Sequence, residues 1–229
     1  MAGLHISQQE RIFLMKKIFA YGNRDEYINY ANAVEGVGGE IVMSTDISDS
    51  ADCDALLLLG GGDINPKVYG CENTASVGIN DTRDEDELAL IKNFYEAGKP
   101  IFGICRGHQI VAVYFGSKMI QHIDNAERHT RTKENKDNVH MIKAVEGSFL
   151  YNIYGSEFPV NSSHHQGVES VPEGFTAAAW SDDGILDGMQ NDEHRIYTTQ
   201  FHPERMCFAN RREDTVDGKA IFEFFLSKI

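Results

Sequence analysis

Short apolar runs alternate with amphipathic helical patterns through the first half of the chain. The runs are continuous rather than alternating, which is typical of strands buried on both faces of a sheet. The expected strands are 15–21, 40–43, 55–59 and 101–104, and the expected helices are 25–37, 84–98 and 108–115. Asp25 is positioned to cap the first helix. The acidic residues near the start of the second helix suit the positive N-terminal end of its dipole. This alternation predicts a mostly parallel sheet flanked by helices on both faces.

The pattern changes beyond residue 116. Residues 122–138 are polar and charged and predict an excursion over the surface. The strands expected after them are 140–145, 158–161, 176–181 and 196–201, which favour a small antiparallel extension over further parallel units. Residues 218–229 predict a closing amphipathic helix capped by Asp217. Residues 1–14 show no clear period, so we expect a disordered extension followed by a single domain over 15–229.

Composition narrows the class of protein. The 229 residues are 41% hydrophobic, which is enough to build a core. Lys and Arg number 21 against 35 Asp and Glu, and the net charge of −14 repels nucleic-acid phosphates and anionic membrane surfaces. No apolar stretch approaches the ~18 residues of a membrane-spanning helix. The four cysteines form no C-x-x-C pair, so we expect separate thiols in a reducing cytoplasm and neither a nucleic-acid nor a membrane partner.

Cys105 stands between a predicted buried strand and the helix that follows at once, in the sequence GICRGHQ. The flanking Gly103 and Gly107 give the backbone room that a side chain needs on a sharp strand-to-helix turn. The N-terminus of the helix favours a thiolate at this position. A buried structural cysteine is the alternative, but the glycine frame favours a reactive nucleophile.

A thiolate nucleophile needs a proton-transfer partner, and the sequence QFHPE at 200–204 offers one. On an extended segment, His202 and Glu204 point to the same side, so that the carboxylate can orient the imidazole. Alone, the motif is more typical of an exposed turn after a strand. Together with Cys105 it predicts a Cys–His–Glu relay.

Acyl transfer also requires N–H donors for the developing oxyanion. One is the backbone N–H of Arg106, the residue after the nucleophile. The three glycines at 60–62 close a predicted buried strand and could supply the other, because glycine lets the backbone approach a substrate closely. A phosphate-binding turn is the alternative for these glycines, but no Lys-Ser/Thr follows them, which disfavours a P-loop.

The segment NSSHHQ at 161–166 follows a predicted strand and is dense in hydrogen-bonding groups, so it could bind the polar end of a substrate. His164 and His165 could instead join His202 and Glu204 in a metal site, since imidazole and carboxylate suit zinc. None of these residues has a dedicated ligand spacing. We therefore expect neither a metal nor a cofactor.

Four segments in this order carry a family resemblance: LLLLGGGDINPKVY at 56–69, residues 83–109 ending in GICRGHQ, NSSHHQ, and QFHPE. With them the chain, from about Lys17 to its last helix, resembles the class I glutamine amidotransferase-like superfamily. Within it, the chain resembles the γ-glutamyl-γ-aminobutyrate hydrolase (PuuD-like) family. The resemblance implies an α/β, flavodoxin-like fold and a γ-glutamyl thioester intermediate. The sequence departs from the family pattern at Leu59, where proline is frequent, and in its short link at 21–26.

The resemblance also implies roles for individual residues. Cys105 is the expected nucleophile, His202 the general acid and base, and Glu204 its orienting partner. The N–H groups of Gly61 and Arg106 are the expected oxyanion hole. The residues expected to bind substrate are Gly62, Gln109, Ser163, His164, His165 and Gln166.

Three functions stay open at this point. The first is a stand-alone hydrolase that cleaves γ-glutamyl-γ-aminobutyrate, or a related small-molecule γ-glutamyl amine, into glutamate and an amine. The second is a glutaminase subunit that supplies ammonia to a synthetase partner, and the third is a non-catalytic binding protein of the same fold. Intact Cys105, His202 and Glu204 favour an enzyme. The oligomeric state, a homodimer included, stays open.

Overall fold

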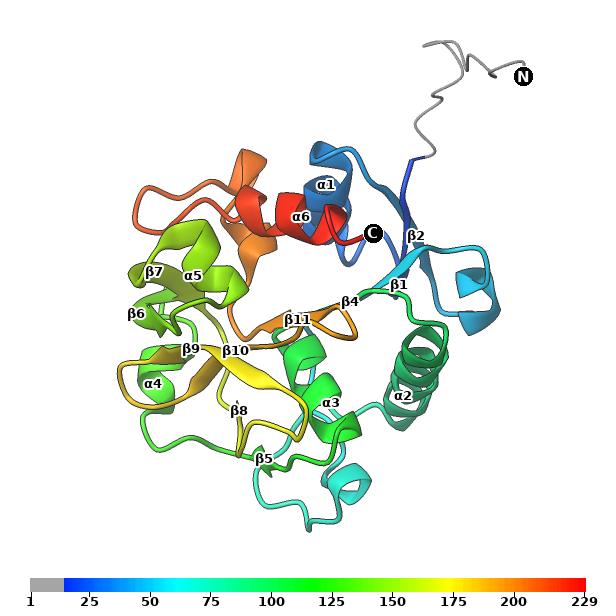
Figure 1. The fold of residues 1–229 in the computed structure, drawn as a ribbon. Coiled ribbons are helices and arrows are strands. Elements are labelled where there is room, and N and C mark those ends of the chain that lie inside the picture. Colours follow the sequence, from blue (N-terminus) through cyan, green and yellow to red (C-terminus); the bar gives the residue numbers. More distant parts are fainter. Residues whose placement is uncertain (1–14) are drawn as a thin grey trace, which may run out of the picture.

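The computed structural model describes residues 15–229, which build a nine-stranded mixed sheet with helices on both faces (Figure 1). The strand order is β2-β1-β3-β4-β11-β10-β9-β6-β7. The parallel half consists of β2 (Glu40–Ser44), β1 (Lys17–Tyr21), β3 (Ala55–Leu58), β4 (Ile101–Ile104) and β11 (Ile196–Thr199). The antiparallel half consists of β10 (Leu186–Asn191), β9 (Thr176–Ser181), β6 (Asn138–Ala144) and β7 (Glu157–Ser162). A separate small sheet pairs β5 (Met119–Ile120) with β8 (Gly167–Val168).

The helices bury two separate apolar clusters against the two faces of this sheet. One face is covered by α1 (Ile28–Gly36), α5 (Phe149–Tyr154) and α6 (Lys219–Leu226), and the other by α2 (Asp81–Glu96) and α3 (Arg106–Tyr114). A short helix, α4 (Ala126–His129), precedes β6. Along β3, Leu57 joins the first cluster whereas Leu56 and Leu58 join the second. Burial on both faces explains the continuous apolar run of this strand.

The parallel half brings the carboxyl ends of β1, β3, β4 and β11 to one edge of the sheet. Three of these strands are followed by residues of the expected site: β3 by the glycines at 60–62, β4 by Cys105 and β11 by the segment 200–204. At this edge the chain order of the strands also reverses, because β2 lies on one side of β1 while β3 and β4 lie on the other. In open α/β sheets, ligands bind at this kind of edge.

The predicted α/β architecture with a mostly parallel sheet is confirmed. The strands predicted at 101–104 and 176–181 coincide with β4 and β9, and the other predicted strands overlap observed ones. The antiparallel placement predicted for 196–201 holds on one side only, because β11 pairs with β10 antiparallel and with β4 in parallel. The chain reaches β11 through β10, a strand that we did not predict. Its buried polar residues Asp187 and Gln190 interrupt the apolar pattern.

The observed helix starts differ from the predicted ones by one to three residues; α3 begins at 106, not 108, and α6 at 219, not 218. α1 begins three residues after Asp25, and its capping position is Tyr27, which makes no side-chain capping bond. α2 begins at residue 81, ahead of the predicted start, and is capped by the side chain of Asn80. At α6 the capping position is Gly218, which makes no side-chain capping bond, and not Asp217 as predicted; Asp217, one residue earlier, accepts a hydrogen bond from the N–H of Lys219 at 2.9 Å.

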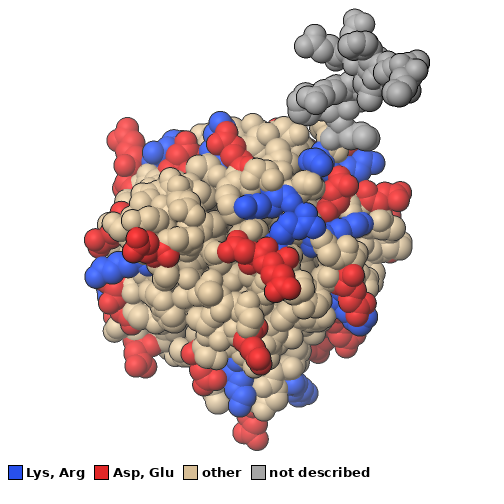
Figure 2. All heavy atoms as spheres, in the orientation of Figure 1, with Lys and Arg blue, Asp and Glu red and all other residues tan. Residues whose placement is uncertain are grey.

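Residues 1–14, predicted as a disordered extension, lie outside the described residues. None of the helices in residues 15–229 has the length and apolarity needed to cross a membrane. On the face drawn in Figure 2, basic and acidic side chains are interspersed. The excess of acidic residues therefore does not form one continuous acidic patch on that face.

Candidate active site

Cys105 lies on the sharp turn between β4 and α3. Its φ of 54° and ψ of −104° are rare for a residue with a side chain and are typical of a strained nucleophile elbow. The turn also requires both flanking glycines. A Cβ on Gly103 would overlap the carbonyl group of Gly107, and a Cβ on Gly107 would overlap the carbonyl group of Leu58. Close packing of the turn against β3 therefore holds the thiol in place.

His202 and Glu204 come from the segment that follows β11. Nδ1 of His202 lies 2.8 Å from Oε1 of Glu204, and both side chains are buried. Glu204 belongs to a 3₁₀ turn, 203–205, and not to the extended segment that we predicted, so the turn brings the carboxylate to the ring. The Cys105 sulfur is close enough to the same imidazole to raise its pKa. With Nδ1 directed at Glu204, Nε2 is the nitrogen that can exchange a proton with the sulfur.

The groups around His202 favour its protonated form. Although burial opposes a charged ring, the Glu204 carboxylate and the Cys105 sulfur raise the pKa of His202 from 6.5 to about 9. At neutral pH the ring is therefore an imidazolium. A nucleophile and a proton for a leaving group then lie side by side.

Tyr30 of α1 is a buried neighbour of this pair that sequence reasoning missed. Its hydroxyl accepts a hydrogen bond from the N–H of Gly60 at 3.0 Å and lies 3.4 Å from Nδ1 of His202. Burial raises the pKa of Tyr30 well above its usual value, so the hydroxyl stays neutral. The only signal in the sequence is the helical spacing of this tyrosine, which predicts core packing rather than a contact with His202.

The glycine loop after β3 lies directly beside Cys105 and His202. A Cβ on Gly60 would lie 2.9 Å from Cε1 of His202 and 3.7 Å from Cβ of Cys105. A Cβ on Gly61 would overlap the guanidinium of Arg83. The N–H groups of Gly61 and Arg106, the expected oxyanion donors, make no hydrogen bond within residues 15–229. Both donors are therefore free for a ligand.

Buried charged side chains next to this loop form a network of salt bridges. Glu87 accepts a hydrogen bond from Nε of Arg83 at 2.8 Å and also pairs with Arg106, whose other terminal nitrogen pairs with Asp84. Asp84 and Glu87 are each only 1% exposed. Asp84 lies in the first turn of α2, as the dipole interpretation requires, and it also pairs with Arg106, a contact that the sequence does not predict. The i, i+4 spacing of Arg83 and Glu87 was the available signal.

The residues expected to bind substrate fall into separate surroundings. Nε2 of Gln109 donates to Oε1 of Gln200 at 3.2 Å, in a buried contact between α3 and the segment after β11. Gln166 donates to Oγ of Ser76 at 2.9 Å, and Nε2 of His165 lies 2.9 Å from Asp63. These last contacts attach the segment 163–166 to the loops after β3. Ser163 is half-buried at the start of this segment.

His164 is buried and neutral. Its Nδ1 donates to the carbonyl of Gln166 at 2.8 Å, and burial lowers the pKa of the ring to about 3. His108, on α3, is likewise held in the core by a 2.7 Å contact with Thr198, and burial lowers its pKa to about 3. Neither ring carries a charge at neutral pH.

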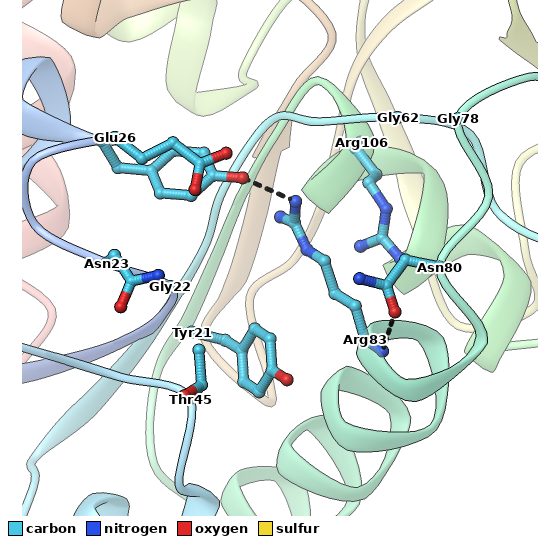
Figure 3. Close-up of a pocket in the computed structure, with 11 residues that line it drawn as sticks. Tyr21, Gly22, Asn23, Glu26, Thr45, Gly62, Gly78, Asn80, Arg83 and Arg106 are labelled. Carbon is cyan, nitrogen blue, oxygen red and sulfur yellow. Dashed lines mark hydrogen bonds between the residues drawn. The ribbon is translucent and has the colours of Figure 1, made fainter.

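Two cavities flank the glycine loop. Figure 3 shows the first, of about 310 Å³, with Arg83, Arg106 and Asn80 on one side and Tyr21 and Asn23 on the other. Gly62, another expected substrate-binding residue, also borders it. The second cavity, of about 320 Å³, is bordered by residues that include Tyr30, Gly60, Gly61, Arg131, Glu204 and Arg205.

The alternative of a metal site finds no geometric support among the described residues. Within 15–229, no three or more His, Cys, Asp or Glu side chains are arranged to hold a metal ion. His164 and His165 instead make the hydrogen bonds described above, while His202 faces Glu204. All four cysteines are free thiols.

Comparison with known proteins agrees with this architecture. The family model Peptidase C26 matches residues 6–204. The glutamine amidotransferase-like protein YvdE of Lactococcus lactis is 36% identical over 176 residues, which cover 75% of this chain and 72% of that protein. A GMP synthase of Streptomyces avermitilis is 34% identical over 139 residues, which cover 60% of this chain but only 23% of the synthase.

The crystal structure of a Thermoplasma acidophilum protein, which is named as part of a GMP synthase, has the same fold. It superposes with a TM-score of 0.65 over 93% of each chain at 23% sequence identity. The family match covers most of the chain, and its relatives carry glutamine amidotransferase names. The chain thus belongs to the Peptidase C26 family, within the class I glutamine amidotransferase-like superfamily of hydrolases.

Proposed function

We propose that the protein is a stand-alone cysteine hydrolase that cleaves γ-glutamyl amides into glutamate and an amine. The observation that carries this proposal is the Cys105 elbow with the buried His202–Glu204 pair beside it. The γ-glutamyl specificity rests on the PuuD-like segments GICRGHQ, NSSHHQ and QFHPE. The substrate is γ-glutamyl-γ-aminobutyrate or a related γ-glutamyl amine.

The first half of the reaction forms a thioester. The Cys105 thiolate attacks the γ-carbonyl carbon, and the resulting oxyanion accepts hydrogen bonds from the N–H groups of Gly61 and Arg106. As the C–N bond breaks, the His202 imidazolium donates its Nε2 proton to the departing nitrogen. A neutral amine leaves, and the γ-glutamyl group stays on the sulfur.

The second half hydrolyses the thioester. Neutral His202 accepts a proton from a water molecule while that water attacks the same carbonyl carbon. The C–S bond then breaks, which releases glutamate and restores the thiolate and the imidazolium. Glu204 holds the Nδ1 proton through both halves and so keeps Nε2 directed at the reacting atoms.

The second cavity suits the amine half of the substrate. It adjoins Gly60 and Gly61, beside the proposed oxyanion hole. Its volume of about 320 Å³ is at the lower end of the ~300–1,000 Å³ typical of small-molecule sites. That size favours a small amine over a polymer.

A glutaminase subunit that feeds ammonia to a synthetase is the second candidate. The names of the Streptomyces and Thermoplasma relatives favour it, since both are named as GMP synthases or parts of one. The chemistry at Cys105 is the same in both candidates. They differ in the leaving group, ammonia or a larger amine, and in the need for a partner.

The deciding experiment measures glutamate release from a panel of γ-glutamyl amides, glutamine included, by the wild type and by Cys105→Ala. Mass spectrometry of the intact protein reports the γ-glutamyl adduct. We expect preference for a γ-glutamyl amine over glutamine, with no release by Cys105→Ala. Preference for glutamine would favour the glutaminase, and release by Cys105→Ala would overturn the mechanism.

A further inference from the structure

Arg83, near the start of α2, hydrogen-bonds to the glycine loop that follows β3. Its Nη2 donates to the carbonyl oxygens of Leu59 at 3.2 Å and of Gly60 at 3.0 Å. Its Nη1 donates to the hydroxyl of Tyr27 at 2.9 Å, and Nε donates to Glu87 at 2.8 Å. The side chain is only 9% exposed. Every nitrogen of this guanidinium therefore has a defined partner, and two of the accepting groups are loop carbonyls.

These carbonyl contacts fix the orientation of the peptide between Gly60 and Gly61. In a trans peptide the C=O and the N–H point in opposite directions, so the Gly60 carbonyl and the Gly61 N–H are oriented together. Two adjoining glycines allow this peptide to turn over with little steric cost. Because Arg83 holds the carbonyl, the Gly61 N–H points away from Nη2 of Arg83. That N–H is also unpartnered within residues 15–229.

The same network reaches the second N–H donor. Arg106 is the first residue of α3, and its backbone N–H has no partner inside that helix. Its guanidinium pairs with Glu87, whose other carboxylate oxygen receives Arg83. One buried carboxylate thus joins the arginine that holds Gly60 to the arginine that carries the other donor.

We propose that Arg83 is a positioning residue that keeps the oxyanion hole assembled before any substrate or partner protein binds. It acts through the Gly60 carbonyl, and it touches no reacting atom. This inference rests on the proposed acyl transfer at Cys105 and deepens it. An oxyanion hole held by an internal arginine needs no partner protein to orient it, which agrees with a stand-alone hydrolase.

The test is Arg83→Lys, which keeps a cation near Glu87 but cannot donate to Leu59, Gly60, Tyr27 and Glu87 at once. Loss of one oxyanion donor costs roughly 10²–10³-fold in kcat, so we expect kcat to fall by about 10²-fold while KM changes less than about threefold. Alkylation of Cys105 by iodoacetamide forms no oxyanion, and its rate should stay within about twofold of wild type.

The matched control is Arg195→Lys. Arg195 also donates to two backbone carbonyls, those of Gly98 and Lys228, but far along the chain from the glycine loop. We expect this variant to keep the wild-type kcat. If Arg83→Lys does not fold, Glu87→Gln weakens the same anchor without replacing Arg83, and the same pattern should appear at about three- to tenfold.

Acylation of Cys105 by p-nitrophenyl acetate separates this inference from the proposed substrate. The reaction passes through an oxyanion but needs no γ-glutamyl recognition, and the nitrophenolate burst reports it. A burst slowed by Arg83→Lys supports the inference even if no γ-glutamyl amide is cleaved. An unchanged burst in a folded variant overturns it, and so does an equal loss of burst and alkylation rates, which would mean a general distortion of the site.

Discussion

Nδ1 of His202 lies 2.8 Å from Oε1 of Glu204, and this contact sets the protonation of the candidate site. The carboxylate is completely buried, and its other oxygen, Oε2, has no hydrogen-bond partner within residues 15–229. Its negative charge is the largest influence that raises the pKa of His202, against the opposing effect of burial. Glu204 therefore acts mainly by charge and by orienting the ring.

Replacing Glu204 by Gln should reduce turnover without abolishing it. The amide keeps the size of the side chain but removes the charge, so burial then lowers the pKa of His202 and less imidazolium is present at neutral pH. We expect kcat to fall by roughly 10²–10⁴-fold, against complete loss in Cys105→Ala, because an orienting residue is partly replaceable. Steady-state kinetics on the best γ-glutamyl substrate measures both. Equal losses would give Glu204 a larger role than orientation.

The pH profile of the wild type should show an alkaline limb near pH 9. The leaving amine takes its proton from the His202 imidazolium, whose pKa is raised to about 9, so kcat/KM should fall as pH rises through that value. In Glu204→Gln the limb should move to lower pH. A wild-type limb near pH 6.5 would mean that the environment of His202 does not raise its pKa.

The same shift has a consequence for stability. A histidine with a raised pKa in the folded state stabilises the fold fully below its unfolded value near 6.5, and this contribution is lost as pH rises to about 9. The free energy of unfolding of the wild type should therefore decrease between pH 7 and 9. Glu204→Gln should show a smaller decrease across that range, and urea titrations at each pH measure the difference.

Tyr30→Phe tests the contact between α1 and the site. The substitution keeps the ring but removes the hydroxyl, so the Gly60 N–H loses its acceptor and His202 loses a polar neighbour. An unsatisfied buried N–H costs about 1–3 kcal/mol, and we expect kcat to fall about tenfold as the loop loosens. Stopped assays of glutamate release measure the rate, and thermal melts measure stability.

Tyr197→Phe is the control for this prediction. Tyr197 is also a buried tyrosine, and its hydroxyl donates to Asp192 at 2.9 Å, outside the candidate site. This variant should lose stability but keep kcat. If both tyrosine variants lose activity equally, the effect of Tyr30 is one of general stability and not of its place beside His202.

Local sequence patterns predicted the elements and the elbow well, because burial on both faces and glycine spacing are local properties. The apolar runs of β3 and β4 identified those strands, and GICRGHQ identified the turn at Cys105. β10 was missed because Asp187 and Gln190 are buried in long-range hydrogen bonds, to His140 and to the backbone of Phe149. No periodicity reports such partners.

The same limit applies to the site. The motifs named Cys105, His202 and Glu204, but the supports came from elsewhere in the chain. Tyr30 is 172 residues away from His202, and Arg83 is 23 residues from Gly60. Their roles depend on the packing of α1 and α2 against the sheet edge. The sequence shows which residues carry a charge, but only the fold shows which carbonyl group such a residue hydrogen-bonds.

The elbow glycine Gly107 gives the sharpest structural prediction. A Cβ there would overlap the carbonyl of Leu58, a backbone group of β3 that cannot swing aside. We expect Gly107→Ala to cost about 1–3 kcal/mol of unfolding free energy and, by shifting Cys105, to lower kcat about 10²-fold. Gly98→Ala is the comparison: its Cβ meets nothing within 4 Å, and only a φ of +63° opposes it. It should cost about 1 kcal/mol and leave kcat unchanged. Denaturant titrations with parallel kinetics compare the two, and an active, fully stable Gly107→Ala would show that the elbow does not depend on this close packing.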